Sequence, residues 1–264
     1  MRKTILSAAV TAALLAPALA SAQTTPAPAP TPALTGNVGL FSQYIFRGLT
    51  QTAGRPALQG GADYAHKSGF YMGTWMSNIS WLSDFGTYTE SSLEWDFYGG
   101  YKGSITGDLG YDVGLLQYYY PGRRLGTSAN TTEAYGALSW KWITGKFSYS
   151  ITDKTFGVLD SFGTWYLDLT ATFPMTDKLS LVGHFGIQKF RGNGGVCAGG
   201  AKNNTCASYE DYKAGATYAL PDSWSIGAFY TGTSMNTTQK AFYTTPSSYY
   251  IGKDTVTAFI QKTF

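Results

Sequence analysis

The chain has 264 residues and a formal net charge of +3 at pH 7; 16% of its residues are aromatic and only 13% are charged. Soluble domains carry roughly 25% charged residues, so this composition leaves few charges for a water-facing surface. Without Arg2 and Lys3, 17 of the 19 basic residues remain against 16 acidic ones. This near-neutral balance, with no basic tract, argues against nucleic acid as a partner.

The N-terminus has the pattern of an export signal. Two basic residues precede an apolar run over 4–19, and small residues provide cleavage motifs ending at Ala20 or Ala22. The run is too short for a membrane-spanning helix and is followed by polar residues, which favours cleavage over an uncleaved anchor. We therefore predict a signal peptide over 1–22 and an extended Pro/Ala-rich linker over 23–34.

The remaining chain, 35–264, repeats segments of about ten residues in which apolar and polar residues alternate. In one of them Leu93, Trp95 and Phe97 share one face and Glu94 and Asp96 the other, as the two-residue period of a strand requires. A soluble sandwich would expose faces of Ser, Thr and Gly with few charges. A barrel in lipid, with apolar faces outward and polar faces inward, fits this pattern better.

Twelve such segments are predicted, and the breaks between them alternate between short and mostly much longer ones. An even number places both ends of a closed antiparallel barrel on one side, together with the short turns. The expected fold is therefore an all-β, transmembrane, up-and-down antiparallel barrel of about 12 strands. The segments are 35–48, 57–65, 70–80, 89–102, 109–120, 132–143, 146–153, 162–173, 178–190, 208–219, 224–232 and 254–264; the short breaks are 66–69, 103–108, 144–145, 174–177 and 221–223.

The last segment is alternating and ends on Phe264, which resembles the assembly signal of outer-membrane barrels. The barrel assembly machinery, outer-membrane lipid and lipopolysaccharide are therefore expected partners, at the cell outer membrane of a Gram-negative bacterium. Basic residues in the long breaks suit either lipopolysaccharide phosphates or ordinary loop solvation, and Arg123 and Arg124 could instead fold inward as a constriction. These basic residues are Arg55, Arg123, Arg124, Lys189, Arg191, Lys202, Lys240 and Lys253.

The same alternation selects the charged side chains that line the lumen. Acids outnumber bases among them, which predicts a weak preference for cations. In the alternative, Arg47 and Lys213 pair with these acids and plug or stiffen the lumen, giving no selectivity. The predicted pore-lining residues are Arg47, Asp63, Glu90, Glu94, Asp96, Lys102, Asp112, Glu133, Lys141, Asp168, His184, Asp211 and Lys213.

Cys197 and Cys206 are the two cysteines of the chain, and both fall in the long break 191–207. An even pair in an exported chain predicts a disulfide that closes this loop. Metal binding is the competing interpretation, but two thiols without a nearby His make a poor metal site. The sequence predicts no cofactor and no metal.

An enzymatic function finds little support in the sequence. A hydrolase of the phospholipase type needs a Ser nucleophile and a His base, and the chain has only His66 and His184. His66 falls in a short turn, and His184 is predicted to face the lumen, whereas such a dyad works on the lipid-facing side. We therefore expect that the protein is not an enzyme.

The block 37–80 resembles the TorF-type porin family of proteobacteria, through YIFRGLTQ (44–51), GRPALQGG (54–61) and SGFYMGTW (68–75). Further matches are 93–100, 111–122 and 181–186, while the insert 191–207 departs from the resemblance. The resemblance implies an outer-membrane pore, and it assigns no catalytic residue to this chain.

We therefore predict a narrow channel for passive diffusion of small solutes or ions, since twelve strands give a lumen between those of eight- and sixteen-stranded barrels. The alternative is a closed structural or adhesive barrel whose long extracellular loops bind a partner. Nothing in the sequence assigns the solute or an oligomeric state.

Overall fold

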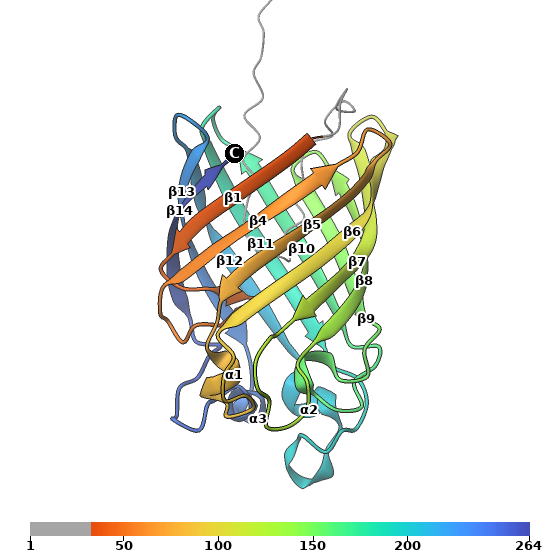
Figure 1. Ribbon diagram of the computed structural model, residues 1–264, viewed down its shortest axis with the longest axis vertical. Helices are drawn as coiled ribbons and strands as arrows, with labels where there is room; N and C mark the ends of the chain where they lie inside the picture. Colours follow the sequence, from red (N-terminus) through yellow and green to blue (C-terminus); the bar gives the residue numbers. More distant parts are fainter. Residues whose placement is uncertain (1–32) are drawn as a thin grey trace, which may run out of the picture.

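The computed structural model describes residues 33–264, so the predicted signal peptide and all but the last two residues of the linker lie outside the described residues. The described chain forms a closed antiparallel barrel of twelve strands, in which β1 pairs with both β4 and β14 (Figure 1). The barrel strands are β1 (Ala33–Phe41), β4 (Ala57–Ala65), β5 (Phe70–Asn78), β6 (Leu93–Thr106), β7 (Leu109–Tyr119), β8 (Thr131–Trp140), β9 (Ile143–Ser150), β10 (Trp165–Pro174), β11 (Leu179–Lys189), β12 (Tyr209–Ala219), β13 (Trp224–Ser234) and β14 (Thr255–Thr263).

The predicted fold class and strand number are confirmed, with local differences in the strand boundaries. The first strand covers Ala33–Phe41 and not 35–48, because the chain leaves the wall after Phe41. One turn lies at 141–142 and not at 144–145, because Lys141 adopts the positive φ of 53° that a two-residue hairpin loop favours. Another lies at 107–108 and not at 103–108, since β6 continues to Thr106.

Alternating side chains give the barrel an apolar exterior and a polar interior. Leu115, Leu169 and Ile260 point outward and are 53%, 46% and 43% exposed, whereas the inward-pointing Glu94 and Asp96 are 1% and 0% exposed. This inverts the usual arrangement of a soluble protein and matches the outward apolar band of barrels that sit in hydrocarbon.

No helix in the part of the chain that the structure describes is long and apolar enough to cross a membrane.

The two ends of the barrel differ. The start of β1, the end of β14 and all five short turns lie at one end, at the top of Figure 1. The six long connections start from the other end, and four of them carry short helices, so the predicted alternation of short and long breaks is present. The helices are α1 (Trp81–Asp84), α2 (Asn203–Ala207), α3 (Thr237–Phe242) and the 3-10 turns Thr155–Gly157 and Ala198–Gly200.

The connection between β11 and β12 is closed by a disulfide between Cys197 and Cys206, whose Cα atoms lie 5.7 Å apart. Both cysteines are buried with Val158 and Phe190 in a small apolar cluster. This cluster packs the loop before β12 against the loop between β9 and β10. The disulfide loop is therefore a packed part of the long-loop end.

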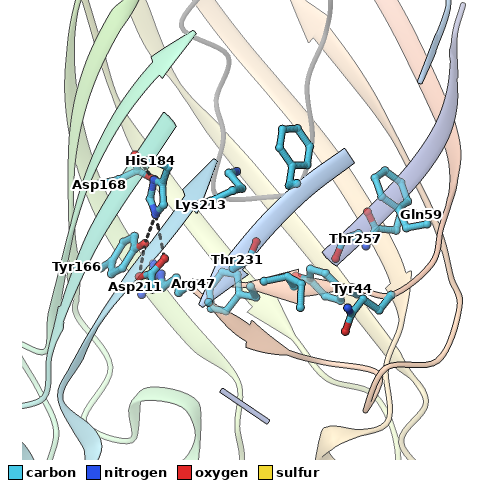
Figure 2. A pocket seen from close by; sticks show the side chains of 16 residues that line it. Tyr44, Arg47, Gln59, Tyr166, Asp168, His184, Asp211, Lys213, Thr231 and Thr257 are labelled. Carbon is cyan, nitrogen blue, oxygen red and sulfur yellow. Dashed lines mark hydrogen bonds and ion pairs between the residues drawn. The ribbon is translucent and has the colours of Figure 1, made fainter. Parts of the chain in front are cut away.

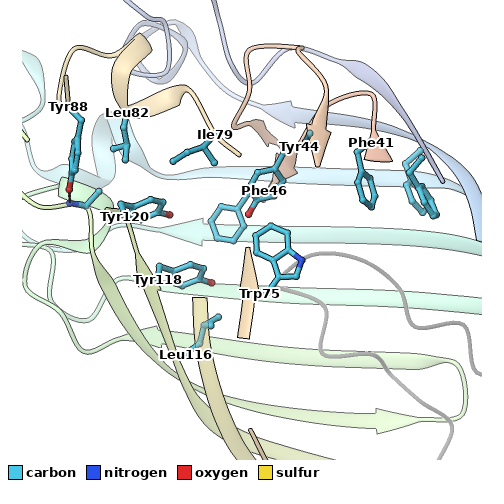
Figure 3. Packing of buried hydrophobic residues seen from close by; sticks show 14 of the residues in the cluster. Phe41, Tyr44, Phe46, Trp75, Ile79, Leu82, Tyr88, Leu116, Tyr118 and Tyr120 are labelled. Carbon is cyan, nitrogen blue, oxygen red and sulfur yellow. Dashed lines mark hydrogen bonds between the residues drawn. The ribbon is translucent and has the colours of Figure 1, made fainter. Parts of the chain in front are cut away.

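An aromatic cluster fills the interior near the long loops (Figure 3). The connection 42–56 contributes Tyr44 and Phe46, which meet Trp75 and Tyr118 of the wall with ring centroids 5.3 Å and 5.6 Å apart. Aromatic pairs of this kind contribute about 0.5–1.5 kcal/mol each beyond their buried area. The cluster thus holds the connection between β1 and β4 inside the barrel.

Candidate channel constriction

The connection between β1 and β4 forms a small hairpin inside the lumen, made of β2 (Ile45–Phe46) and β3 (Leu49–Thr50). Arg47 and Gly48 form its tip, with φ of 47° and 79°, the positive values that two-residue hairpin loops require. A Cβ atom on Gly48 would lie 2.5 Å from the Cβ of Asp211 on β12. The tip therefore touches the inner face of β12, and only glycine fits there without displacement.

Arg47 extends from this tip to the inner face of the wall, beside Asp211 and Tyr166 (Figure 2). Its guanidinium lies 2.7 Å from the Glu133 carboxylate on β8 and donates a 2.8 Å hydrogen bond to Gln188 on β11. It also lies 4.3 Å from the centre of the Tyr166 ring on β10. The Arg47 side chain thus connects the hairpin to three strands of the wall, β8, β10 and β11.

The Arg47–Glu133 pair is almost completely shielded, since each side chain is only 2% exposed. Burial alone would lower the pKa of the Arg47 guanidinium, but the attraction of the Glu133 carboxylate outweighs it, and the pKa is raised. Arg47 therefore remains a cation. In such a low-dielectric setting the loss of one partner is far more costly than the loss of a surface ion pair.

Strands β10, β11 and β12 carry a second polar network (Figure 2). His184 on β11 lies between two carboxylates: its Nδ1 is 3.3 Å from Asp168 and its Nε2 is 2.9 Å from Asp211. The Tyr166 hydroxyl donates a 2.9 Å hydrogen bond to Asp211. The amino group of Lys213 lies 5.2 Å from the Phe229 ring centre. This network forms the surface on which the hairpin tip rests.

A cavity of about 80 Å³ lies between the hairpin and this wall. Charged groups of Asp168, Asp211 and Lys213 line one part, and Phe41 and Phe229 line another. On this measure one water needs about 10–15 Å³, so the cavity has room for several waters or small ions.

Most of the predicted pore-lining residues lie at or near the hairpin. Asp63 and Asp112 lie farther toward the short-turn end, where they accept hydrogen bonds of 2.6 Å and 2.5 Å from Tyr98 and Tyr71. Lys102 also lies there, 5.2 Å from the Tyr71 ring centre. The residues at or near the hairpin are Arg47, Glu94, Asp96, Glu133, Asp168, His184, Asp211 and Lys213.

Two predicted pore-lining residues are placed elsewhere. Glu90 is exposed in the connection before β6, because that strand begins only at Leu93 and the alternation does not extend back to Glu90. Lys141 is exposed in the short turn between β8 and β9, with its amino group 4.9 Å from the Trp140 ring centre. The lumen prediction is therefore wrong for both.

The sequence interpretation missed Lys146 and the hairpin itself. Lys146 is buried on the inner face of β9, 4.0 Å from the Tyr135 ring centre, and its alternation with Phe147 could have identified it. The hairpin had a signal as well, because Arg47-Gly48 separates two short pairs with high strand propensity, Ile45-Phe46 and Leu49-Thr50, as a two-residue turn does. Arg123 and Arg124, considered as a constriction, are exposed on the loop between β7 and β8.

Within residues 33–264, no group of three or more His, Cys, Asp or Glu side chains is placed to hold a metal ion.

Solved outer-membrane channels share this fold. The KdgM porin aligns with a TM-score of 0.52 at 7% identity, covering 87% of this chain and 99% of that chain. The KdgM porin in complex with disordered oligogalacturonate aligns with a TM-score of 0.50 at 8% identity, covering 88% and 98%. An outer-membrane channel from Pseudomonas putida F1 aligns with a TM-score of 0.50 at 10% identity, covering 89% and 97%.

At identities this low, the similarity shows only a shared fold. No curated protein matches the sequence. The model of a bacterial protein family of unknown function, Gcw_chp, matches residues 25–264, and the chain belongs to this family.

Proposed function

We propose that the protein is an outer-membrane porin, a narrow channel for passive diffusion of small solutes or ions, with the β2–β3 hairpin as its constriction. The observation that carries this proposal is the arginine-tipped hairpin inside a closed barrel with an apolar exterior and a charged interior. A wall of this kind belongs in a lipid bilayer, and a charged interior serves passage of polar solutes. The resemblance to the TorF-type porins adds support.

Placement in the outer membrane of a Gram-negative bacterium is part of this proposal. It rests on the predicted signal peptide and on the apolar exterior of the barrel. Export followed by insertion through the barrel assembly machinery would leave the six long loops facing lipopolysaccharide.

The charge of the lumen favours cations. The inner-face acids are Asp63, Glu94, Asp96, Asp112, Glu133, Asp168 and Asp211, and the bases are Arg47, Lys102, Lys146 and Lys213. Arg47 forms an ion pair with Glu133, so the alternative in which Arg47 pairs with a lumen acid holds for this residue. The remaining inner-face acids still outnumber the remaining bases. Rings of one sign of charge set the ion preference of a pore.

Liposome swelling tests the proposed function. Liposomes that contain the purified protein are diluted into isotonic solutions of sugars, organic acids and amino acids of increasing size. We expect swelling rates that fall steeply with solute size and favour cationic over anionic amino acids. Rates equal to those of protein-free liposomes for every solute would contradict the proposal.

A closed barrel that binds a partner through its long loops is the second candidate function. The observation that favours it is the small cavity of about 80 Å³ beside a nearly inaccessible ion pair. In that case removal of the hairpin contacts would open no path for solutes, and the packed, disulfide-closed end would be the functional surface.

We propose no catalytic role. The hydroxyl nearest to His184 is that of Thr170, 3.0 Å from its Nδ1, and it donates a 2.6 Å hydrogen bond to Asp168. A hydroxyl engaged in this way is not held by a general base for attack on a substrate.

A further inference from the structure

The inner face of β6 carries two carboxylates that no basic side chain neutralises. Asp96 is 0% exposed, and neither of its carboxylate oxygens has a hydrogen-bond partner among the described residues. Glu94 lies two residues away on the same face, is 1% exposed and accepts a 2.7 Å hydrogen bond from the Tyr44 hydroxyl. The ion pairs formed within residues 33–264 involve neither carboxylate.

Aromatic rings surround Asp96 where a basic residue would be expected. Its cross-strand neighbours are Trp75 on β5 and Tyr118 on β7, and such neighbours have Cβ atoms about 4.5–5.5 Å apart. The Tyr44 ring of the hairpin closes this space, 5.3 Å from Trp75 (Figure 3). The faces of such rings attract cations.

A fully buried carboxylate without a partner is energetically costly, so its charge requires compensation. Arg47 is the basic residue of the hairpin, and it is committed to Glu133. The compensating group must therefore be a proton or a cation from solution. Residues two apart in a strand are separated by about 7 Å, so carboxylates at these positions can converge on one ion between them.

We propose that Asp96 and Glu94 bind a small monovalent inorganic cation, K⁺ or Na⁺, beneath the hairpin. We infer a singly charged ion because the site offers few oxygen ligands among aromatic rings, and a divalent ion gives up its hydration shell at a much higher free-energy cost. This proposal rests on the proposed function in one respect: the ion must reach the site through the lumen. It deepens that function by assigning the cation preference to one place in the channel.

The first test measures binding without any conductance. The full-length barrel in detergent micelles is unfolded by heat in KCl, NaCl or N-methylglucamine chloride at equal ionic strength. We expect a higher unfolding midpoint in K⁺ or Na⁺, with a saturating dependence on concentration, because a ligand that binds only the folded state stabilises it. The variant Asp96→Asn is expected to lose this difference, and the matched lumen variant Asp63→Asn to keep it.

The second test uses reversal potentials across a KCl gradient in planar bilayers. We expect Asp96→Asn to lower the K⁺ to Cl⁻ permeability ratio several-fold and Asp63→Asn to change it much less. If Asp96→Asn does not fold, Glu94→Gln removes the other carboxylate, and the same losses are expected.

Equal midpoints in all three salts, with Asp96→Asn more stable than wild type in each, would mean that Asp96 carries a proton and would overturn the site. A bilayer that stays sealed would contradict the proposed channel and not the site, because the unfolding midpoints still report cation binding. A conducting channel with equal midpoints would overturn the site alone.

Discussion

Arg47 and Glu133 show how much of this interior depends on single side chains. They belong to different elements, the hairpin and β8, and each is 2% exposed. Removal of one partner from such a pair costs about 3–5 kcal/mol, because the other charge stays buried, whereas replacement of both is often nearly neutral.

We therefore predict that Arg47→Met lowers the free energy of unfolding by about 3–5 kcal/mol and that Arg47→Met/Glu133→Gln recovers most of this loss. Urea unfolding in detergent micelles or lipid, followed by tryptophan fluorescence, measures both. Equal destabilisation by the single and the double variant would mean that packing of the long Arg47 side chain, and not its charge, is what matters.

Alternation along the sequence could predict residues such as Asp168 and His184, because they lie in the middle of regular strands, where the two-residue period fixes the face. It failed for Glu90 and Lys141, which lie beyond the ends of β6 and β8. Pairing of Arg47 with a lumen acid was one of two interpretations, but the partners Glu133 and Gln188 could not be identified, since they lie 86 and 141 positions away in the chain.

At the scale of elements, the β2–β3 hairpin differs from every predicted segment. The sequence pattern extends the first strand to residue 48, because Ile45 and Phe46 are apolar and continue a strand-like run. In the structure Phe46 packs inward against Tyr118 and Phe156, and the turn at Gly48 ends the run. Tertiary packing in the lumen thus overrides a local strand pattern.

Gly48→Ala should push the hairpin tip away from β12. The added Cβ would lie 2.5 Å from the Cβ of Asp211, at a φ of 79° that costs a non-glycine residue about 1–2 kcal/mol. We expect a larger single-channel conductance together with lower thermal stability. Gly54→Ala is the matched control, since its φ is 77° but its Cβ would meet only the Tyr249 hydroxyl, at 3.0 Å. Equal conductance of the two variants would contradict contact between the tip and the wall.

The disulfide loop is a separate element with a local effect. In Cys197→Ser/Cys206→Ser the loop between β11 and β12 loses a cross-link over a sequence separation of 9, which lowers its local stability by about 2–3 kcal/mol. Hydrogen exchange is expected to speed up in this loop and to stay unchanged in the barrel strands. Faster exchange throughout β10–β13 would mean that the loop also supports the wall.

At the scale of the whole molecule, composition and alternation were sufficient to predict a twelve-stranded closed barrel. Low charge excluded a soluble surface, and alternating short and long breaks separated the two ends. The filling of the lumen was beyond such reasoning, because strand alternation describes the wall and carries no information about which connection folds inward.

If the outward face of the barrel lies in hydrocarbon, a charged side chain in the middle of a strand should destabilise the fold. Leu169→Arg, in the middle of β10, is expected to cost about 2–4 kcal/mol in lipid. Leu125→Arg is the matched control, because Leu125 is 65% exposed on the loop between β7 and β8, and surface substitutions of that kind stay within about 0.5 kcal/mol. Equal, small effects in lipid vesicles would argue against a membrane location of β10.

Single-channel recording in planar bilayers tests the proposed channel most directly, with wild type and Arg47→Ala compared under the same salt gradient. We predict discrete conductance steps with a cation-selective reversal potential for wild type, and larger steps for Arg47→Ala, which removes the guanidinium that joins the hairpin tip to Glu133 on the wall. Bilayers that remain sealed with both proteins, although both are folded and inserted, would contradict the channel.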